Sequence, residues 1–184
     1  HRYERLVQSL GAAQIPPLPT PPIVATNGQN KLGLCPGAEY GPAKRWLPER
    51  FAEVAAAVDG EWILFGTAKD AEIGRAIENS LGEKCVNRIG QTTLEELIAE
   101  LRACRLLLTN DTGTMHLATM LGVPVVAIFG STEDRLTGPL GAGNIVVRHH
   151  VECSPCFLRE CPLDFRCMNA VTAEEVTAAV LRLL

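Results

Sequence analysis

The run Asn110-Asp111-Thr112-Gly113-Thr114 holds the residues of this chain that are best suited to bind an anion. It follows an apolar stretch, Leu106–Leu108, and leads into a segment with helical spacing. This pattern predicts a strand, a sharp turn and a helix. The Asp111 carboxylate would cap that helix, and the amides of residues 112–114 would offer the positive end of its dipole to a phosphate. Helix capping without any ligand is the alternative interpretation.

Two neighbouring features favour a ligand at this turn. His116 lies a few residues into the predicted helix and can face the turn. Ser131 and Thr132 follow the next apolar run directly after Gly130, at the end of a second predicted strand. Ligands of open parallel sheets bind beyond the carboxyl ends of the strands. We therefore count His116 and Ser131 among the candidate substrate-binding residues.

The loop after the first predicted strand, residues 36–46, offers a second phosphate-binding element. Its glycines, Gly37 and Gly41, permit a close approach of backbone to ligand, and Lys44 and Arg45 can neutralise a pyrophosphate. No GxGxxG follows this strand, so the usual dinucleotide fingerprint is absent. We expect Lys44 to be the more important cation, and the alternative is a solvated Lys-Arg pair.

Composition bounds the possible functions. The 184 residues are 47% hydrophobic with a formal net charge of −4, which suits one globular domain and gives no electrostatic reason to expect nucleic acid. No apolar run approaches the roughly 20 residues that span a membrane, so we expect peripheral membrane association at most.

The order of elements predicts an α/β fold. Predicted strands alternate with predicted helices, which favours a doubly wound, mainly parallel Rossmann-like sheet of five or six strands. The strands are expected at 31–35, 61–65, 85–88, 106–108, from residue 124, and 145–148, and the helices at 48–58, 70–80, 93–101, after residue 111, and from residue 172.

The first 30 residues differ from the rest. Residues 1–11 are expected to form a short helix, and the proline-rich stretch 15–22 a stiff linker of the kind that joins domains. The chain begins with His1 and carries no signal segment. We expect residues 31–184 to be one domain of a longer protein whose partner domain lies upstream.

Four motifs together resemble a known family. They are PGAEYGPAKRW at 36–46, FGTAKD at 65–70, TNDTGTMH at 109–116 and FGST at 129–132. In this order they are similar to the bacterial lipopolysaccharide heptosyltransferases of glycosyltransferase family 9. The resemblance implies a GT-B architecture of two Rossmann-like domains, of which this chain would be the C-terminal, donor-binding half. The catalytic carboxylate base and the acceptor surface would belong to the absent N-terminal domain.

The resemblance also implies a reaction. Members transfer heptose from ADP-heptose to the lipopolysaccharide inner core with inversion, with no cofactor required for catalysis, in the cytoplasm at the inner face of the inner membrane. Two alternatives remain open. One is another GT-B sugar-nucleotide enzyme, such as a UDP-sugar transferase or an epimerase, and the other is a non-catalytic module that binds a nucleotide or a metal.

Site residues carry over by position. The resemblance places Lys44 at the donor diphosphate, where it would stabilise the leaving group, Thr92 near the adenine, and residues 66–69 near the ribose. Ala68 stands where some members carry an acidic residue that grips the ribose. The full set of predicted substrate-binding residues is Gly37, Ala38, Lys44, Thr92, Asp111, Thr112, Gly113, Thr114, His116 and Ser131.

Seven cysteines are many for this length. Cys153, Cys156, Cys161 and Cys167 share one segment that begins with CxxC, which permits a structural zinc ion or an iron–sulfur cluster. Reduced thiols or disulfides are the alternatives. We expect this segment to be a surface clasp remote from the donor site. The remaining cysteines, Cys35, Cys85 and Cys104, and both tryptophans, Trp46 and Trp62, are expected to pack in the core.

Overall fold

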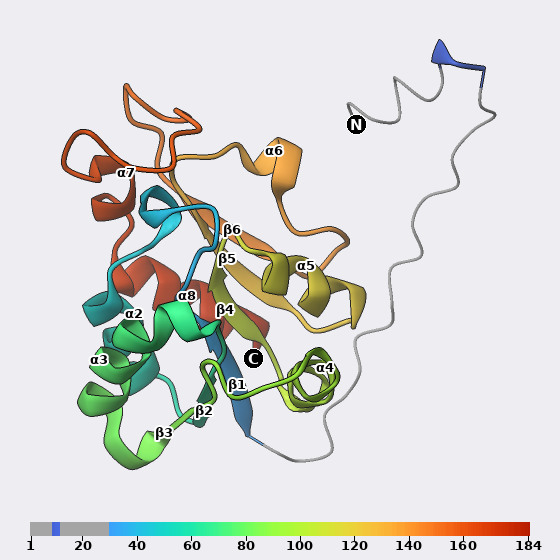
Figure 1. Cartoon of the computed structure of the whole chain (residues 1–184), viewed down its shortest axis with the longest axis vertical. Coiled ribbons are helices and arrows are strands. Elements are labelled where there is room, and N and C mark those ends of the chain that lie inside the picture. Colours follow the sequence, from blue (N-terminus) through green and yellow to red (C-terminus); the bar gives the residue numbers. More distant parts are fainter. Residues whose placement is uncertain (1–8, 12–29) are drawn as a thin grey trace.

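The computed structural model describes residues 9–11 and 30–184 (Figure 1). The linker expected over 15–22, and the helix expected over 1–11 apart from its last three residues, lie outside the described part of the chain. In the described part, no helix is long and apolar enough to cross a lipid bilayer.

Residues 30–184 contain one six-stranded sheet with the order β3-β2-β1-β4-β5-β6. Every adjacent pair of strands is parallel. This is the strand order of the doubly wound Rossmann fold, in which the chain reverses direction across the sheet between β1 and β4. The predicted fold class is confirmed. The strands are β1 (Lys31–Cys35), β2 (Glu61–Leu64), β3 (Cys85–Asn87), β4 (Leu107–Asn110), β5 (Val125–Phe129) and β6 (Ile145–Arg148).

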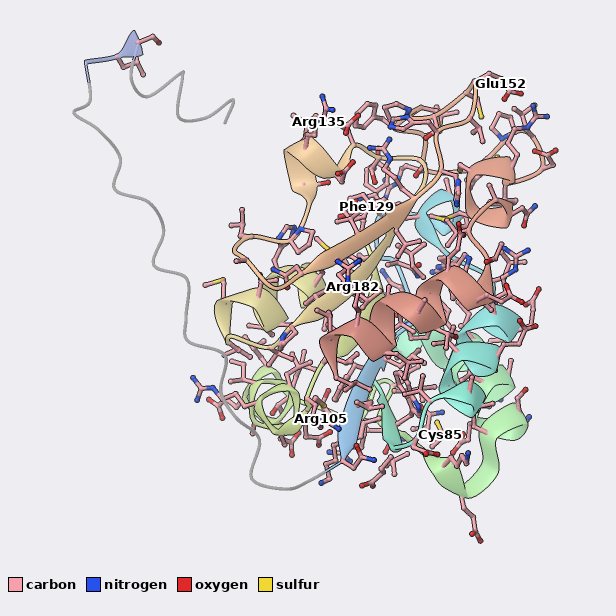
Figure 2. The ribbon with its side chains drawn as sticks, turned by 180° about the vertical axis from the view of Figure 1, so that it is seen from behind. Cys85, Arg105, Phe129, Arg135, Glu152 and Arg182 are labelled. Carbon is pink, nitrogen blue, oxygen red and sulfur yellow. The ribbon has the colours of Figure 1, made fainter. Side chains whose placement is uncertain are left out.

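Helices cover both faces of this sheet. One face carries α2, α3 and α8, and the other carries α4 and α5 (Figures 1 and 2). The helices are α2 (Pro48–Ala57), α3 (Ala71–Leu81), α4 (Leu94–Ala103), α5 (Gly113–Met120), α6 (Asp134–Thr137), α7 (Arg166–Asn169) and α8 (Ala173–Leu183). Three short 3-10 turns complete the set: η1 (Pro42–Lys44), η2 (Ala68–Asp70) and η3 (Gly82–Lys84).

The two-sided core explains the apolar runs in the sequence. In the central strand β4 and just before it, Leu106 and Leu108 pack toward α2 and α8, whereas Leu107 packs toward α4 and α5. All three side chains are fully buried. Successive strand residues point to opposite faces, so a strand covered on both faces must be apolar throughout. Cys35, Cys85, Cys104, Trp46 and Trp62 are also buried, as expected.

Two predicted helix starts are confirmed in detail. Thr93 and Glu96 form a reciprocal capping box at α4, and Thr172 and Glu175 form another at α8. In each box the threonine hydroxyl accepts from a backbone amide while the glutamate carboxylate accepts from the threonine amide. These local bonds fix where α4 and α8 begin.

Because the strands are parallel, their carboxyl ends meet at one edge of the sheet. Figure 2 shows this edge at the end that carries Glu152 and Arg135, opposite the end that carries Arg105 and Cys85. The predicted site residues lie in the loops that leave β1, β3, β4 and β5 at this edge and in the first turn of α5. The fold therefore brings the predicted site together at its switch point.

Candidate ligand-binding site

A cavity of about 450 Å³ opens at the switch point. It is lined by loops that follow β1, β2, β3 and β4 and by the first turns of α4 and α5. Six of the predicted substrate-binding residues line it: Gly37, Ala38, Thr92, Thr112, Gly113 and Thr114. Residues from three separate motifs thus share one concave site.

Sequence reasoning missed the apolar side of this cavity. Leu94 and Leu97, on the first turns of α4, line it together with Gly90, which precedes that helix. Leu94 is 65% exposed, so its apolar side chain is accessible to a ligand in the cavity. The sequence could have indicated this apolar side through Leu94, which directly follows the capping Thr93 at a position where a helix usually has polar residues.

The turn before α5 differs from its prediction in one respect. Asp111 does not cap the helix; Thr112 does, because its hydroxyl accepts from the amide of Met115. Thr112 has the extended backbone of an N-cap, and helical geometry starts at Gly113. The shift of one residue leaves the amides at the helix start facing the cavity edge and frees the Asp111 carboxylate for another partner.

That partner is Lys44. Its Nζ lies 2.6 Å from Asp111 Oδ2, and the two side chains are only 13% and 5% exposed. The same oxygen accepts a hydrogen bond of 2.7 Å from the Thr132 hydroxyl and a longer one from Thr137. Charge-assisted bonds of this length hold both partners firmly. The predicted cation of the first motif is therefore fixed beside the predicted turn of the third.

Asn110 positions the loop that carries Lys44. Its buried side chain donates 2.7 Å to the carbonyl of Pro36 and accepts 3.1 Å from the amide of Trp46. These two bonds fasten both ends of the 36–46 loop to the end of β4. Trp46 is further held by its indole, which donates to the carbonyl of Val171. The sequence suggested Asn110 only as part of a polar turn, and its role as a tether became visible once the loop was placed.

Gly37 and the Asp70 carboxylate lie very close together in the wall of the cavity. A Cβ atom at Gly37 would overlap the carboxylate of Asp70, so this position requires glycine. Asp70 itself is 5% exposed, accepts from Thr67 and lies 3.4 Å from Arg45. Burial raises the pKa of the Cys35 thiol in the same wall, which keeps it neutral and unsuited to nucleophilic attack.

Four predicted residues lie outside the set that lines this cavity. Lys44 and Asp111 form the ion pair described above. His116 is partly exposed at the end of the first turn of α5. Ser131 is 1% exposed, and its hydroxyl has no hydrogen-bond partner among the described residues. A substrate role for His116 and Ser131 stays a prediction.

The expected position of the cysteine-rich segment requires a correction for residues 151–165, which hold Cys153, Cys156 and Cys161. This segment is not remote from the site, because the Arg159 carbonyl accepts a 3.0 Å bond from the amide of Ala43, next to Lys44. The order of elements along the chain placed this loop after the strands that build the site. The loop is long enough, however, to contact the turn that follows β1.

The thiols of Cys153, Cys156, Cys161 and Cys167 are all free. Burial raises the pKa of Cys167, and nearby Cys153, Cys156 and Cys161 act in the same direction. Over residues 9–11 and 30–184, no three metal-ligating side chains are grouped so as to hold an ion. A structural metal at these cysteines stays a prediction.

Comparison with known families gives a direct match. Residues 10–165 fit the sequence model of glycosyltransferase family 9 (heptosyltransferase). The chain belongs to this family. Among curated family 9 proteins, it is 36% identical over 170 residues to lipooligosaccharide heptosyltransferase 2 of Campylobacter jejuni, covering 88% of this chain and 54% of that protein. It is 41% identical over 124 residues to lipopolysaccharide heptosyltransferase 2 of Salmonella typhimurium, covering 64% of this chain and 36% of that protein.

Solved structures agree with the family assignment. The structure of Escherichia coli ADP-heptose lipopolysaccharide heptosyltransferase II superposes with a TM-score of 0.72 at 32% identity, covering 85% of this chain and 47% of that one. The expected likeness to the lipopolysaccharide heptosyltransferases of family 9 is confirmed. The chain spans about half the length of such family 9 relatives.

Proposed function

We propose that this chain is the donor-binding half of an inverting heptosyltransferase that takes heptose from ADP-heptose and transfers it to the lipopolysaccharide inner core. One observation carries the proposal. The start of α5 lines the cavity at the switch point, and Asp111, the residue before the Thr112 cap, holds the nearly buried Lys44. ADP-heptose, the sugar nucleotide for which the E. coli relative is named, has a diphosphate that such an arrangement suits.

Lys44 and the start of α5 would act on the leaving group. Inverting transfer creates an electron-poor sugar carbon while negative charge grows on the departing ADP. A fixed ammonium and backbone amides at that position stabilise this charge without reorganising at the moment of reaction. We propose no metal or other cofactor in the transfer, because Lys44 and the amides of residues 113 and 114 supply the positive charge.

Asp111 would have two functions in this site. Its Oδ2 takes part in all three bonds described above, to Lys44, Thr132 and Thr137. None of these bonds uses Oδ1, which can accept from a hydroxyl of the sugar. Asp111 would therefore orient both the cation and the transferred heptose.

The opposite end of the cavity would hold the nucleoside. Leu94 and Leu97 offer apolar surface to a base, and Thr92 lies beside them. Ala68 lines the cavity next to Gly66 and Thr67, where no carboxylate is available from position 68 to grip the ribose. We therefore expect backbone groups of residues 66–68 to contact the ribose.

The remaining partners follow from the same proposal. The acceptor would be the lipopolysaccharide core, bound by an N-terminal acceptor domain that also supplies the base. The protein would act in the cytoplasm at the inner face of the inner membrane, with peripheral association at most. Nothing in the net charge of −4 favours a nucleic acid partner.

Calorimetric titration of the chain with ADP, UDP and NAD tests this function. We expect ADP to bind more tightly than UDP, because Thr92, Leu94 and Leu97 are placed to hold a purine. NAD carries the same purine, but none of the predicted contacts serves its nicotinamide riboside, so we expect it to bind no more tightly than ADP. A preference for UDP would support a different GT-B sugar-nucleotide enzyme. Preferential binding of NAD would reject both transferase proposals.

A further inference from the structure

The cysteine-rich segment 151–165 is fastened to the sheet edge beside the proposed donor site. The Ser154 hydroxyl donates 2.5 Å to the carbonyl of Gly130, and the Phe157 amide donates 2.7 Å to the carbonyl of Ser131. Both acceptors directly follow β5. The segment therefore has a fixed origin on the same edge from which the Asp111 turn emerges.

Beyond these two anchors, the segment is hydrogen-bonded to the turn that carries Lys44. Three hydrogen bonds join them: from Ala43 N to Arg159 O (3.0 Å), from Arg159 Nε to Tyr40 O (2.7 Å), and from the Tyr40 hydroxyl to Phe157 O (2.9 Å). A Cβ atom at Gly41 would overlap the Arg159 carbonyl. The contact is thus so close that the sequence needs a glycine opposite Arg159.

The Tyr40 ring connects Arg159 to Lys44. The Lys44 ammonium lies 4.9 Å from the centre of this ring, and the Arg159 guanidinium lies 5.2 Å from it. Both distances are within the range of a cation–aromatic interaction. Lys44 is therefore located by two groups, the Asp111 carboxylate on one side and the Tyr40 ring on the other.

We propose that Arg159 is a positioning residue for Lys44: it holds Tyr40 and the 40–44 turn where the Lys44 ammonium reaches the donor diphosphate. The identity of the ligand in this inference rests on the proposed function. The contact between Arg159 and the 40–44 turn does not depend on that function. Arg159 does not line the cavity at the switch point, so it would act through the turn. A small displacement of a positioned group lowers the rate strongly, because the transition state demands accurate placement.

The test is a double-mutant cycle in the complete protein. We expect Arg159→Ala to lower kcat for heptose transfer about tenfold with a smaller change in the donor KM. Arg159→Lys, which keeps a cation over the ring, should recover part of the loss. In a Lys44→Ala background, Arg159→Ala should have no further effect, because the group it positions is gone. Arg75→Ala, an exposed arginine bonded only within α3, is the matched control.

Other outcomes are equally decisive. An unchanged kcat in Arg159→Ala, or effects of Arg159→Ala and Lys44→Ala that simply add, would overturn the proposal. Where Lys44→Ala leaves no measurable transfer, the same cycle is run on ADP affinity. Should Arg159→Ala fail to fold, Gly41→Ala replaces it, because the added methyl group displaces the Arg159 carbonyl from the turn.

A second readout separates this proposal from the proposed function. Amide hydrogen exchange of the peptide covering residues 40–45 should quicken in Arg159→Ala whether or not heptose is transferred, since this residue holds the turn. If the parent protein transfers no heptose, the proposed function fails, and exchange still decides whether Arg159 holds the turn. Unchanged exchange in this peptide would reject the positioning role.

Discussion

At the scale of single residues, the site depends on one nearly buried ion pair. Lys44 and Asp111 are 67 positions apart, and each is almost fully shielded from water. Two charges are costly to bury, so such a pair is weak evidence for a contribution to stability. Both residues were predicted for the site from the sequence, but their direct contact was not, because spacing along the chain says nothing about which side chains meet.

The first prediction concerns Lys44. In the complete protein, Lys44→Ala should lower kcat about 100-fold, a typical loss for one preorganised group that stabilises developing charge. The donor KM should change less, because the interaction strengthens as the diphosphate departs. Steady-state kinetics with ADP-heptose measure both constants. Lys84→Ala, an exposed lysine of η3, is the control. A raised KM with unchanged kcat would show that Lys44 binds ground state and transition state equally.

At the scale of elements, the sequence predicted what is encoded locally. The start of α8 could be placed because Thr172 and Glu175 satisfy each other's bonds within one turn. Asp111 was predicted to cap α5, but the cap is Thr112. Either side chain could accept the capping bond, and the Asp111 carboxylate is instead paired with Lys44. The tether formed by Asn110 was not predictable, because its partners are backbone groups of a loop far away in the sequence.

A second prediction follows for that tether. Asn110→Ala removes three bonds, which join its side chain to the Pro36 carbonyl, the Gly37 carbonyl and the Trp46 amide. We expect the free energy of unfolding to fall by about 3 kcal/mol, measured by urea denaturation. Asn169→Ala, which removes an exposed side chain–backbone bond, should cost less than about 1 kcal/mol. Equal losses in the two variants would mean that Asn110 is not a special anchor.

A third prediction concerns the capping glutamates. The Thr93 amide holds the pKa of Glu96 below its usual 4.5, and the Thr172 amide does the same for Glu175, assisted by His149. A carboxylate with a lowered pKa stabilises the fold above its unfolded-state pKa and loses this effect as the pH falls through its folded-state pKa.

The measurement compares the parent with Glu96→Gln/Glu175→Gln, whose amides can still cap the helices. The parent should be more stable at pH 7, and its advantage should vanish as the pH falls below 4.5. Thermal denaturation at a series of pH values gives both curves. Parallel curves across this interval would show that the two carboxylates contribute nothing through their charge.

At the scale of the whole molecule, the fold class followed from the alternation of strands and helices, and the site followed from the rule that parallel strands end at one edge. The position of the segment 151–165 did not follow. Its bonds to Gly130, Ser131 and Tyr40 all end on backbone carbonyls, which every residue type carries, so the acceptors leave no pattern of residue types. Gly41 is the one sequence feature that this contact explains, because a side chain there would collide with the Arg159 backbone.

The last prediction concerns the chain of residues 1–184 on its own. We expect it to bind ADP, because the cavity is built from loops of one sheet edge, and to transfer no heptose, because the proposed base lies outside it. The acidic residues that line the cavity support this expectation. Asp70 is buried and accepts from Thr67, and the Glu39 carboxylate is bound to Lys69 at 2.5 Å.

The two properties are measured separately on the same preparation. Calorimetry reports ADP binding, and mass spectrometry of a lipopolysaccharide core acceptor incubated with ADP-heptose reports transfer. The Lys44→Ala variant identifies any transfer due to a contaminating enzyme, since such activity would be unaffected by the substitution. Transfer by the parent chain that disappears in Lys44→Ala would mean that a residue within these 184 positions serves as the base. Glu39, which lines the cavity and is exposed to solvent, would then be the first residue to replace.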